Sequence, residues 1–204
     1  MLTLYHAPLS RSSRIVRLLE ELGARDRVEI RTVDISRRDG SGGHDPDNPH
    51  PEGKVPLLVH DGVQVRESNA IILYLTDLFP EAGLAPRIGD PARGTYLSLL
   101  AYYGNVMEPV LVLQVAGLAH PVLTVTLRGV PEMEARLAEA LAGRDFLLGD
   151  RFSAADLLLV SPFVWFPEAM PAAPAIRAWV ARCEARPSAA RTTEFDAALI
   201  AARS

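Results

Sequence analysis

Three serines lie in the stretch APLSRSSR, between a strand-like LTLY and an amphipathic helical pattern. Serine is common at such junctions because its hydroxyl caps the first free amides of a helix. A second interpretation gives one hydroxyl a chemical role. It donates a hydrogen bond to a bound thiolate and adds to the helix dipole, which lowers the pKa of a thiol at a helix amino terminus. The residues alone leave both interpretations open.

Glu67 and Ser68 directly precede an apolar helical run. Ser68 is a good N-cap, which stabilises any helix by about 1 kcal/mol. A helix amino terminus also binds anions, and a neighbouring carboxylate pairs with an ammonium group. The pair therefore fits the zwitterionic head group of an α-amino acid, although a simple helix start explains it equally well.

Val55 and Pro56 open a segment that otherwise has the pattern of a buried strand. Proline is tolerated at the first residue of a strand, where the missing amide hydrogen costs little. Alternatively, a cis bond would direct the backbone of Val55 toward a ligand. Since only about one X-Pro bond in twenty is cis, the residues alone favour the trans form.

Several other kinds of chemistry are excluded. The net charge of −4 argues against a nucleic-acid surface. No serine has the G-x-S-x-G surround of a hydrolase nucleophile. The single cysteine, Cys183, falls on an apolar helical stripe and favours packing. The histidines lack metal-ligand spacing, so we expect a solvated loop and no metal site from His44, Asp45, Asp47 and His50.

The elements that must position these residues follow from periodicity and turn signals. Residues 2–5 and the RVEIRTVDI stretch predict strands on either side of a helix that ends near Gly23. A Gly/Pro/Asp-rich loop over 36–53 precedes two strands joined at Asp61-Gly62, and a helix over about 68–79 follows. This order predicts a small mixed sheet with helices.

The second half has a helical character. Asp90-Pro91 and Pro131 are helix starts, and Pro109 should kink or end the helix it interrupts. Ser153 and Asp156 form a capping box. We therefore expect one domain over residues 1–80, a linker over 81–89 and an all-helical domain over 90–204. No apolar run approaches the ~20 residues of a membrane span, and no signal peptide is evident, which predicts a cytoplasmic protein.

The combined pattern resembles the cytosolic glutathione S-transferases, in a bacterial, serine-type form. LYHAPLSRSSRIVRLLEELG, NPHPEGKVPLLVHDG, VRESNAIILYLTDLFPEAGLAP and GDRFSAADLLL occur in the family's order and at nearly its spacings. The resemblance implies a thioredoxin-like α/β domain, an all-α domain and glutathione as the co-substrate, without a metal. It further implies a cis Val55-Pro56 bond whose backbone binds the cysteinyl part, and a γ-glutamyl site at Glu67 and Ser68.

Other assignments also depend on the resemblance. Lys54 or His50 reaches the glycine carboxylate, and Ser10 occupies the position of the activating residue, with Ser12 as the alternative. Tyr5 is one residue out of register with tyrosine-type members. The loop over 36–53 and the short apolar span between Pro109 and Pro131 depart from the family's pattern.

The resemblance predicts a homodimeric enzyme in detoxification that transfers alkyl or aryl groups. The glutathione thiolate attacks a small hydrophobic electrophile. Alternatives are a non-catalytic glutathione-binding or interaction module, or a glutathione-dependent isomerase or disulfide reductase. No nucleic acid or membrane is expected as a partner. The residues expected to line the electrophile pocket, which can also be plain core, are Leu9, Tyr102, Tyr103, Met107 and Trp165.

Overall fold

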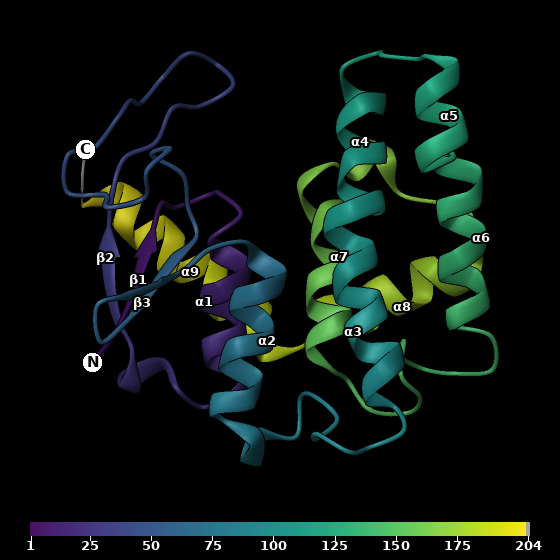
Figure 1. Ribbon diagram of the computed structural model, residues 1–204, viewed down its shortest axis with the longest axis horizontal. Coiled ribbons are helices and arrows are strands. Elements are labelled where there is room, and N and C mark those ends of the chain that lie inside the picture. The colour runs from purple at the N-terminus through teal and green to yellow at the C-terminus, as the bar shows by residue number, and fades with distance from the viewer. Residues whose placement is uncertain (203–204) are drawn as a thin grey trace. The chain divides into compact units, whose positions relative to one another are not determined.

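The computed structural model describes residues 1–202 and divides the chain into two compact units (Figure 1). The first unit is Met1–Ala82 together with the stretch that begins at Arg186, and the second is Gly83–Ala185. The sequence placed all of residues 90–204 in one helical domain. The structure instead returns the last helix to the first unit, because that helix packs against the first helix of the chain.

The first unit contains a four-stranded mixed sheet, as expected. Its strands are β1 (Leu2–His6), β2 (Glu29–Thr32), β3 (Leu57–His60) and β4 (Val63–Val65), in the order β2-β1-β3-β4. β1 pairs parallel to β2, whereas β1 with β3 and β3 with β4 are antiparallel. Asp61 and Gly62 close the β3–β4 hairpin with φ angles of 49° and 86°, the left-handed pair that a type I′ turn requires.

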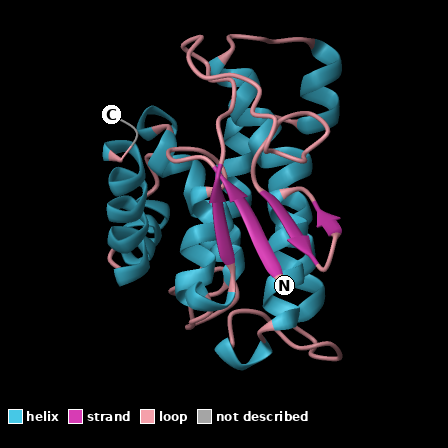
Figure 2. Cartoon of the chain, turned by 90° about the vertical axis from the view of Figure 1, so that its left-hand side faces the viewer, coloured by secondary structure: helices cyan, strands magenta, loops and turns pink. Residues whose placement is uncertain are grey.

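Helices cover one face of this sheet. α1 (Ser13–Glu21), followed by the short η1 (Arg25–Arg27), connects β1 to β2, and α2 (Ser68–Leu78) with η2 (Pro80–Ala82) follows β4. Figure 2 looks onto the strands with these helices behind them. The last helix, α9 (Pro187–Ala201), lies beside α1, where Glu21 pairs with Arg186 at 2.6 Å (Figure 1). The loop over 36–53 is irregular, as its composition predicts.

The second unit is helical throughout its described elements. α3 (Arg93–Tyr102), the π-helical turn η3 (Tyr103–Met107) and α4 (Glu108–Val115) follow one another without a break. They are followed by α5 (Pro121–Leu127), α6 (Val130–Ala140), α7 (Ala154–Trp165), η4 (Pro167–Ala169) and α8 (Pro174–Glu184). α3 begins later than Pro91, because Asp90 caps a preceding turn by accepting a hydrogen bond from the amide of Ala92 at 2.8 Å.

Pro109 does not break its helix. Proline has no amide hydrogen for the carbonyl four residues back, and the backbone before it widens into the turn η3. By length and composition alone, the continuous run Arg93–Val115 is long and apolar enough to cross a membrane, contrary to the sequence-based expectation. A core helix passes the same test, and Tyr96, Leu99 and Leu100 of this run are buried.

The predicted capping box is present at the start of α7. The amide and hydroxyl of Ser153 donate to Oδ2 of Asp156 at 2.9 and 2.6 Å. Oδ1 accepts from the amide of Leu147 at 2.8 Å and from Nε1 of Trp179 at 2.9 Å. Burial raises the pKa of Asp156, although these four donors oppose the shift. Asp156 thus joins α7 to α8 as well as capping α7.

Candidate functional site

The serine turn, residues 7–13, connects β1 to α1 and gives its hydroxyls different environments. Ser10 is half-buried, and its Oγ donates to the carbonyl of Ala7 at 2.7 Å and accepts from the amide of Ser12 at 3.1 Å. Ser12 is completely buried. Its Oγ lies 2.8 Å from Nδ1 of His6 and 2.7 Å from Oγ of Ser10. A ligand in solvent can therefore reach Ser10 but not Ser12.

The backbone of the serine turn is held from α9. Leu9 has a φ of 53°, a left-handed conformation that costs a non-glycine residue roughly 1–2 kcal/mol. Its amide donates to Oδ2 of Asp196 at 2.8 Å, and the hydroxyl of Ser13 donates to the same oxygen at 2.6 Å. The two bonds fix the turn on both sides of Ser10.

The Val55-Pro56 bond is cis, as the resemblance implied. Val55 is half-buried and packs against a small apolar cluster of Tyr5, Val33 and Leu57. The carbonyl of Lys54, one residue earlier, accepts from Nδ2 of Asn48 at 3.2 Å. Tyr5 is thus a core residue below this segment, consistent with its exclusion from the reacting groups on register.

The Glu67-Ser68 pair lies where β4 gives way to α2, but the two residues do not occupy the expected positions. Glu67 is itself the N-cap, with its carbonyl accepting from the amide of Ile71 at 2.9 Å, and Ser68 is the first helical residue. Glu67 has a φ of 67° and is exposed. Such a conformation costs of order 1–3 kcal/mol in a non-glycine residue and clusters at ligand sites.

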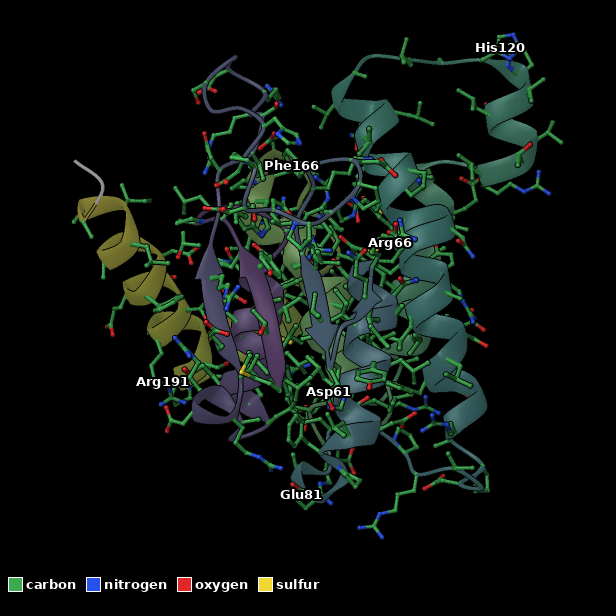
Figure 3. The ribbon with its side chains drawn as sticks, turned by 60° about the vertical axis from the view of Figure 1, so that its left-hand side comes forward. Asp61, Arg66, Glu81, His120, Phe166 and Arg191 are labelled. Carbon is green, nitrogen blue, oxygen red and sulfur yellow. The ribbon has the colours of Figure 1, made fainter. Side chains whose placement is uncertain are left out.

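A cavity of about 440 Å³ lies next to these segments in the first unit, within the size range of small-ligand sites. It brings together three predicted residues, His50, Lys54 and Glu67. Figure 3 labels Arg66 at the end of β4 opposite the Asp61 turn. Arg66 was missed, although the VRES motif contains it. The full lining is His50, Glu52, Lys54, Gln64, Val65, Arg66 and Glu67.

Charges of both signs surround this cavity. Lys54 forms an ion pair with Glu52, which raises the pKa of the ammonium group, and Glu67 adds to that effect. The positive charge of Arg11 opposes it, so the serine turn lies within electrostatic reach of the cavity. Exposed cations beside exposed carboxylates suit a ligand that carries both an ammonium group and carboxylates.

His50 is buried at the wall of the cavity. Its Nδ1 accepts from the amide of Glu52 at 3.1 Å, which leaves the proton of the neutral ring on Nε2. Burial lowers the pKa of His50, the positive charges of Arg66 and Lys54 act in the same direction, and the negative charges of Glu52 and Glu67 oppose the shift without reversing it. At neutral pH the ring is therefore a neutral donor.

The residues predicted to line an electrophile pocket divide between the units. Leu9 is 56% exposed and belongs to the first unit. Tyr103 and Met107 are buried in the core of the second unit, which favours a packing role for both. Tyr102 and Trp165 are half-buried. The structure therefore does not bring these five residues together within either unit.

The strand order and the helical second unit define the class of protein, a thioredoxin-like domain followed by an all-α domain. Residues 4–83 match the family model "Glutathione S-transferase, N-terminal domain", and residues 121–187 match "Glutathione S-transferase, C-terminal domain". A sphingomonad glutathione S-transferase, solved in complex with glutathione, is 31% identical. The alignment covers 96% of this chain and 98% of that one, with a TM-score of 0.77.

A glutathione transferase from Methylococcus capsulatus is 27% identical over 97% of this chain and 99% of that chain, with a TM-score of 0.78. A shorter match joins 44 residues to Protein LigF of Sphingobium sp. at 50% identity, which covers 22% of this chain and 17% of that protein. The chain belongs to the glutathione S-transferase family.

Proposed function

We propose that the protein is a glutathione transferase that acts on a small hydrophobic electrophile. Ser10 donates a hydrogen bond to the sulfur of glutathione, and the amino terminus of α1 adds its dipole to the stabilisation of the thiolate. The thiolate attacks an electrophilic carbon and forms a carbon–sulfur bond as the leaving group departs with its electron pair. Alkyl or aryl groups are thereby transferred to glutathione.

The remainder of glutathione binds along the charged cavity. The backbone of Val55 pairs with the cysteinyl part, and Glu67 with Ser68 takes the γ-glutamyl head group. Lys54 and the Nε2–H of His50 take the glycine carboxylate. The observation that carries this proposal is the difference in burial between the two serines, because the half-exposed Ser10 retains a hydroxyl that a ligand can reach. The sphingomonad relative was solved with glutathione bound, which supports the choice of thiol.

Calorimetry and a conjugation assay test the proposal together. We expect glutathione to bind to the purified protein and a chlorodinitrobenzene to be conjugated in its presence. The absence of binding heat would refute the proposed thiol. Binding without turnover of a panel of electrophiles would favour the non-catalytic module. Turnover without net conjugation would point to a glutathione-dependent isomerase or disulfide reductase.

The proposal includes a homodimer in the cytoplasm with a role in detoxification. Support for self-association comes from an apolar groove of about 580 Å³ on the first unit. Tyr74 and Leu78 on its rim are 36% and 38% exposed. Large exposed apolar side chains that line one groove favour a protein partner. We propose that this partner is a second copy of this chain. The groove is lined by Val65, Ala70, Leu73, Tyr74, Asp77 and Leu78.

A further inference from the structure

A buried row of polar groups extends behind Ser10, from the serine turn to α9. Oγ of Ser10 lies 2.7 Å from Oγ of Ser12, which lies 2.8 Å from Nδ1 of His6. Nε2 of the same ring lies 3.0 Å from Oδ1 of Asp196. His6 and Ser12 are completely buried, and Asp196 is 2% exposed. Four side chains thus form a continuous hydrogen-bonded path that ends at the residue proposed to contact the thiol.

The partners of Asp196 determine where the protons lie. Burial opposes ionisation of Asp196, but hydrogen bonds from His6, Ser13 and the Leu9 amide outweigh it and lower its pKa. The group is therefore a carboxylate, which only accepts hydrogen bonds. Nε2 of His6 must then carry a hydrogen for Oδ1. In the neutral ring this leaves Nδ1 as the acceptor. The hydroxyl of Ser12 can donate to Nδ1 at 2.8 Å or to the carbonyl of Ala7 at 3.2 Å, and the shorter contact is the one with His6.

The remaining hydroxyl is the one that can turn outward. With its hydrogen committed to His6, Oγ of Ser12 acts as an acceptor, and the amide of Ala7 donates to it at 3.1 Å. The hydrogen of Ser10 can then go to Ser12, to the carbonyl of Ala7 or to a ligand. In the ligand-free arrangement Ser12 and His6 can donate inward, toward Asp196, while Ser10 donates to the carbonyl of Ala7 or to Ser12.

We propose that His6, paired with Asp196, accepts the proton of the glutathione thiol through the hydroxyls of Ser12 and Ser10. This inference rests on the proposed function. The S–H bond breaks, and its proton moves to Oγ of Ser10. The proton of Ser10 moves to Oγ of Ser12, and that of Ser12 to Nδ1 of His6. The sulfur keeps the electron pair as a thiolate, and His6 becomes an imidazolium.

The transfer reverses the direction of each hydrogen bond between the sulfur and His6 and leaves the number of these bonds unchanged. After it, Nδ1 of His6 donates to Ser12, Ser12 donates to Ser10, and Ser10 donates to the sulfur. The imidazolium is compensated by the carboxylate of Asp196, as a histidine–carboxylate pair compensates charge in a serine hydrolase. Two further groups against His6 are neutral, namely the Phe195 ring from α9 and Ser12 from the serine turn, and the guanidinium of Arg25 lies 4.7 Å from the centroid of the Phe195 ring. His6, Ser12 and Asp196 are positioning residues, since they act on the sulfur only through Ser10.

Counting released protons separates this relay from loss of the thiol proton to water. Glutathione and S-methylglutathione are titrated by calorimetry into the purified protein at neutral pH, in buffers of different ionisation enthalpy. Ultraviolet absorbance of the complex gives the thiolate fraction. The S-methyl ligand has no thiol proton, so subtraction removes contributions of the amino and carboxyl groups. For the wild type we expect glutathione and S-methylglutathione to release nearly the same number of protons to the buffer. An excess of about one proton per thiolate with glutathione would overturn the relay.

Two variants interrupt the relay at different atoms. His6→Asn retains a side-chain oxygen that can accept from Ser12 but cannot hold the proton. In Asp196→Asn, the oxygen must face the Leu9 amide, so the NH₂ group faces His6 and moves the ring hydrogen to Nδ1. For both variants we expect release of about one proton per thiolate formed, and kcat reduced at least about tenfold with a smaller change in KM.

Thr192→Val is the matched control, because Thr192 is buried one turn earlier on α9 and donates to the carbonyl of Ser188 at 2.8 Å. We expect it to leave the proton count and kcat unchanged. Equal loss of kcat in Thr192→Val and Asp196→Asn would overturn the relay in favour of a structural role for α9. No binding of glutathione to the wild type would refute the proposed function itself. If a variant fails to fold, the number of protons that the wild type releases per thiolate formed still tests the relay.

Discussion

Replacing Ser10 with alanine removes the hydroxyl that we assign to the sulfur of glutathione. In the ligand-free protein this Oγ also accepts from the amide of Ser12 at 3.1 Å, at the start of α1. Loss of that hydrogen bond costs about 1 kcal/mol in the free energy of unfolding. The larger effect concerns the bound thiolate, which loses a donor while the dipole of α1 remains.

The size of the catalytic effect follows from the hydrogen bond lost. A hydrogen bond to a charged group contributes about 1.5–3 kcal/mol. Since one pKa unit corresponds to about 1.4 kcal/mol, the pKa of the bound thiol should rise by roughly one to two units in Ser10→Ala. Below that pKa, the thiolate fraction, and with it kcat, should fall roughly 10- to 100-fold.

The assay is a spectrophotometric pH titration of the bound thiol, combined with the pH profile of kcat for conjugation. Ser10→Thr retains the hydroxyl and should keep most of the activity. Ser12→Ala removes a hydroxyl that solvent does not reach. Any effect of this variant on the pKa of the bound thiol should therefore act through Ser10. An unchanged thiol pKa in Ser10→Ala would refute the assignment of Ser10, and glutathione binding measured in the same samples would show whether the site survives.

Three further results are expected. Glu67→Gln keeps the shape of the side chain but loses its charge, so Kd for glutathione and for S-methylglutathione should rise equally, roughly tenfold, in calorimetry. In Glu21, burial raises the pKa, but hydrogen bonds from Arg186 and Ser188 lower it overall. The native pKa lies below the unfolded one, so this stability is present above the unfolded pKa and is lost as pH falls through the native pKa. Glu21→Gln should therefore flatten the fall in melting temperature between about pH 6 and pH 3, and an unchanged slope would contradict the assignment. Leu78→Asp should convert the dimer to a monomer in light scattering, whereas a wild-type monomer would remove the dimer from the proposal.

Local patterns in the sequence were sufficient to predict most of the helices, strands and turns. The helix over 68–79, the Asp61-Gly62 turn and the Ser153–Asp156 capping box appear where the sequence placed them, within a residue or so. These features depend on neighbours within a few residues, so their signals are contiguous in the chain. The cis form of Val55-Pro56 was different, because base rates favoured trans and the family resemblance indicated cis.

Other features depended on contacts that no local pattern contains. The residues that α9 buries are polar, namely Ser188, Thr192 and Asp196, so no apolar stripe in its sequence specifies the sheet domain as its partner. Pro109 was expected to kink or end a helix, and the run does not end there, because a π-helical turn before it keeps the helix continuous. Ser68 was expected as the N-cap of α2, yet Glu67 takes that position with a positive φ. Helix boundaries vary by a residue or two because the terminal turns of a helix fray.

The sequence by itself determined that a serine-rich turn, a Val-Pro strand start and an acid-serine pair occur in one small domain. The family resemblance put Ser10 ahead of Ser12, and only the tertiary structure adds that the two serines differ in burial, because that difference arises from the packing around His6. Asp196 had no signal at all in the sequence. It lies 190 residues from His6 along the chain, and only folding α9 back onto α1 brings the two within 3.0 Å. A hydrogen bond requires proximity and direction, and for residues so distant in sequence both depend on the fold.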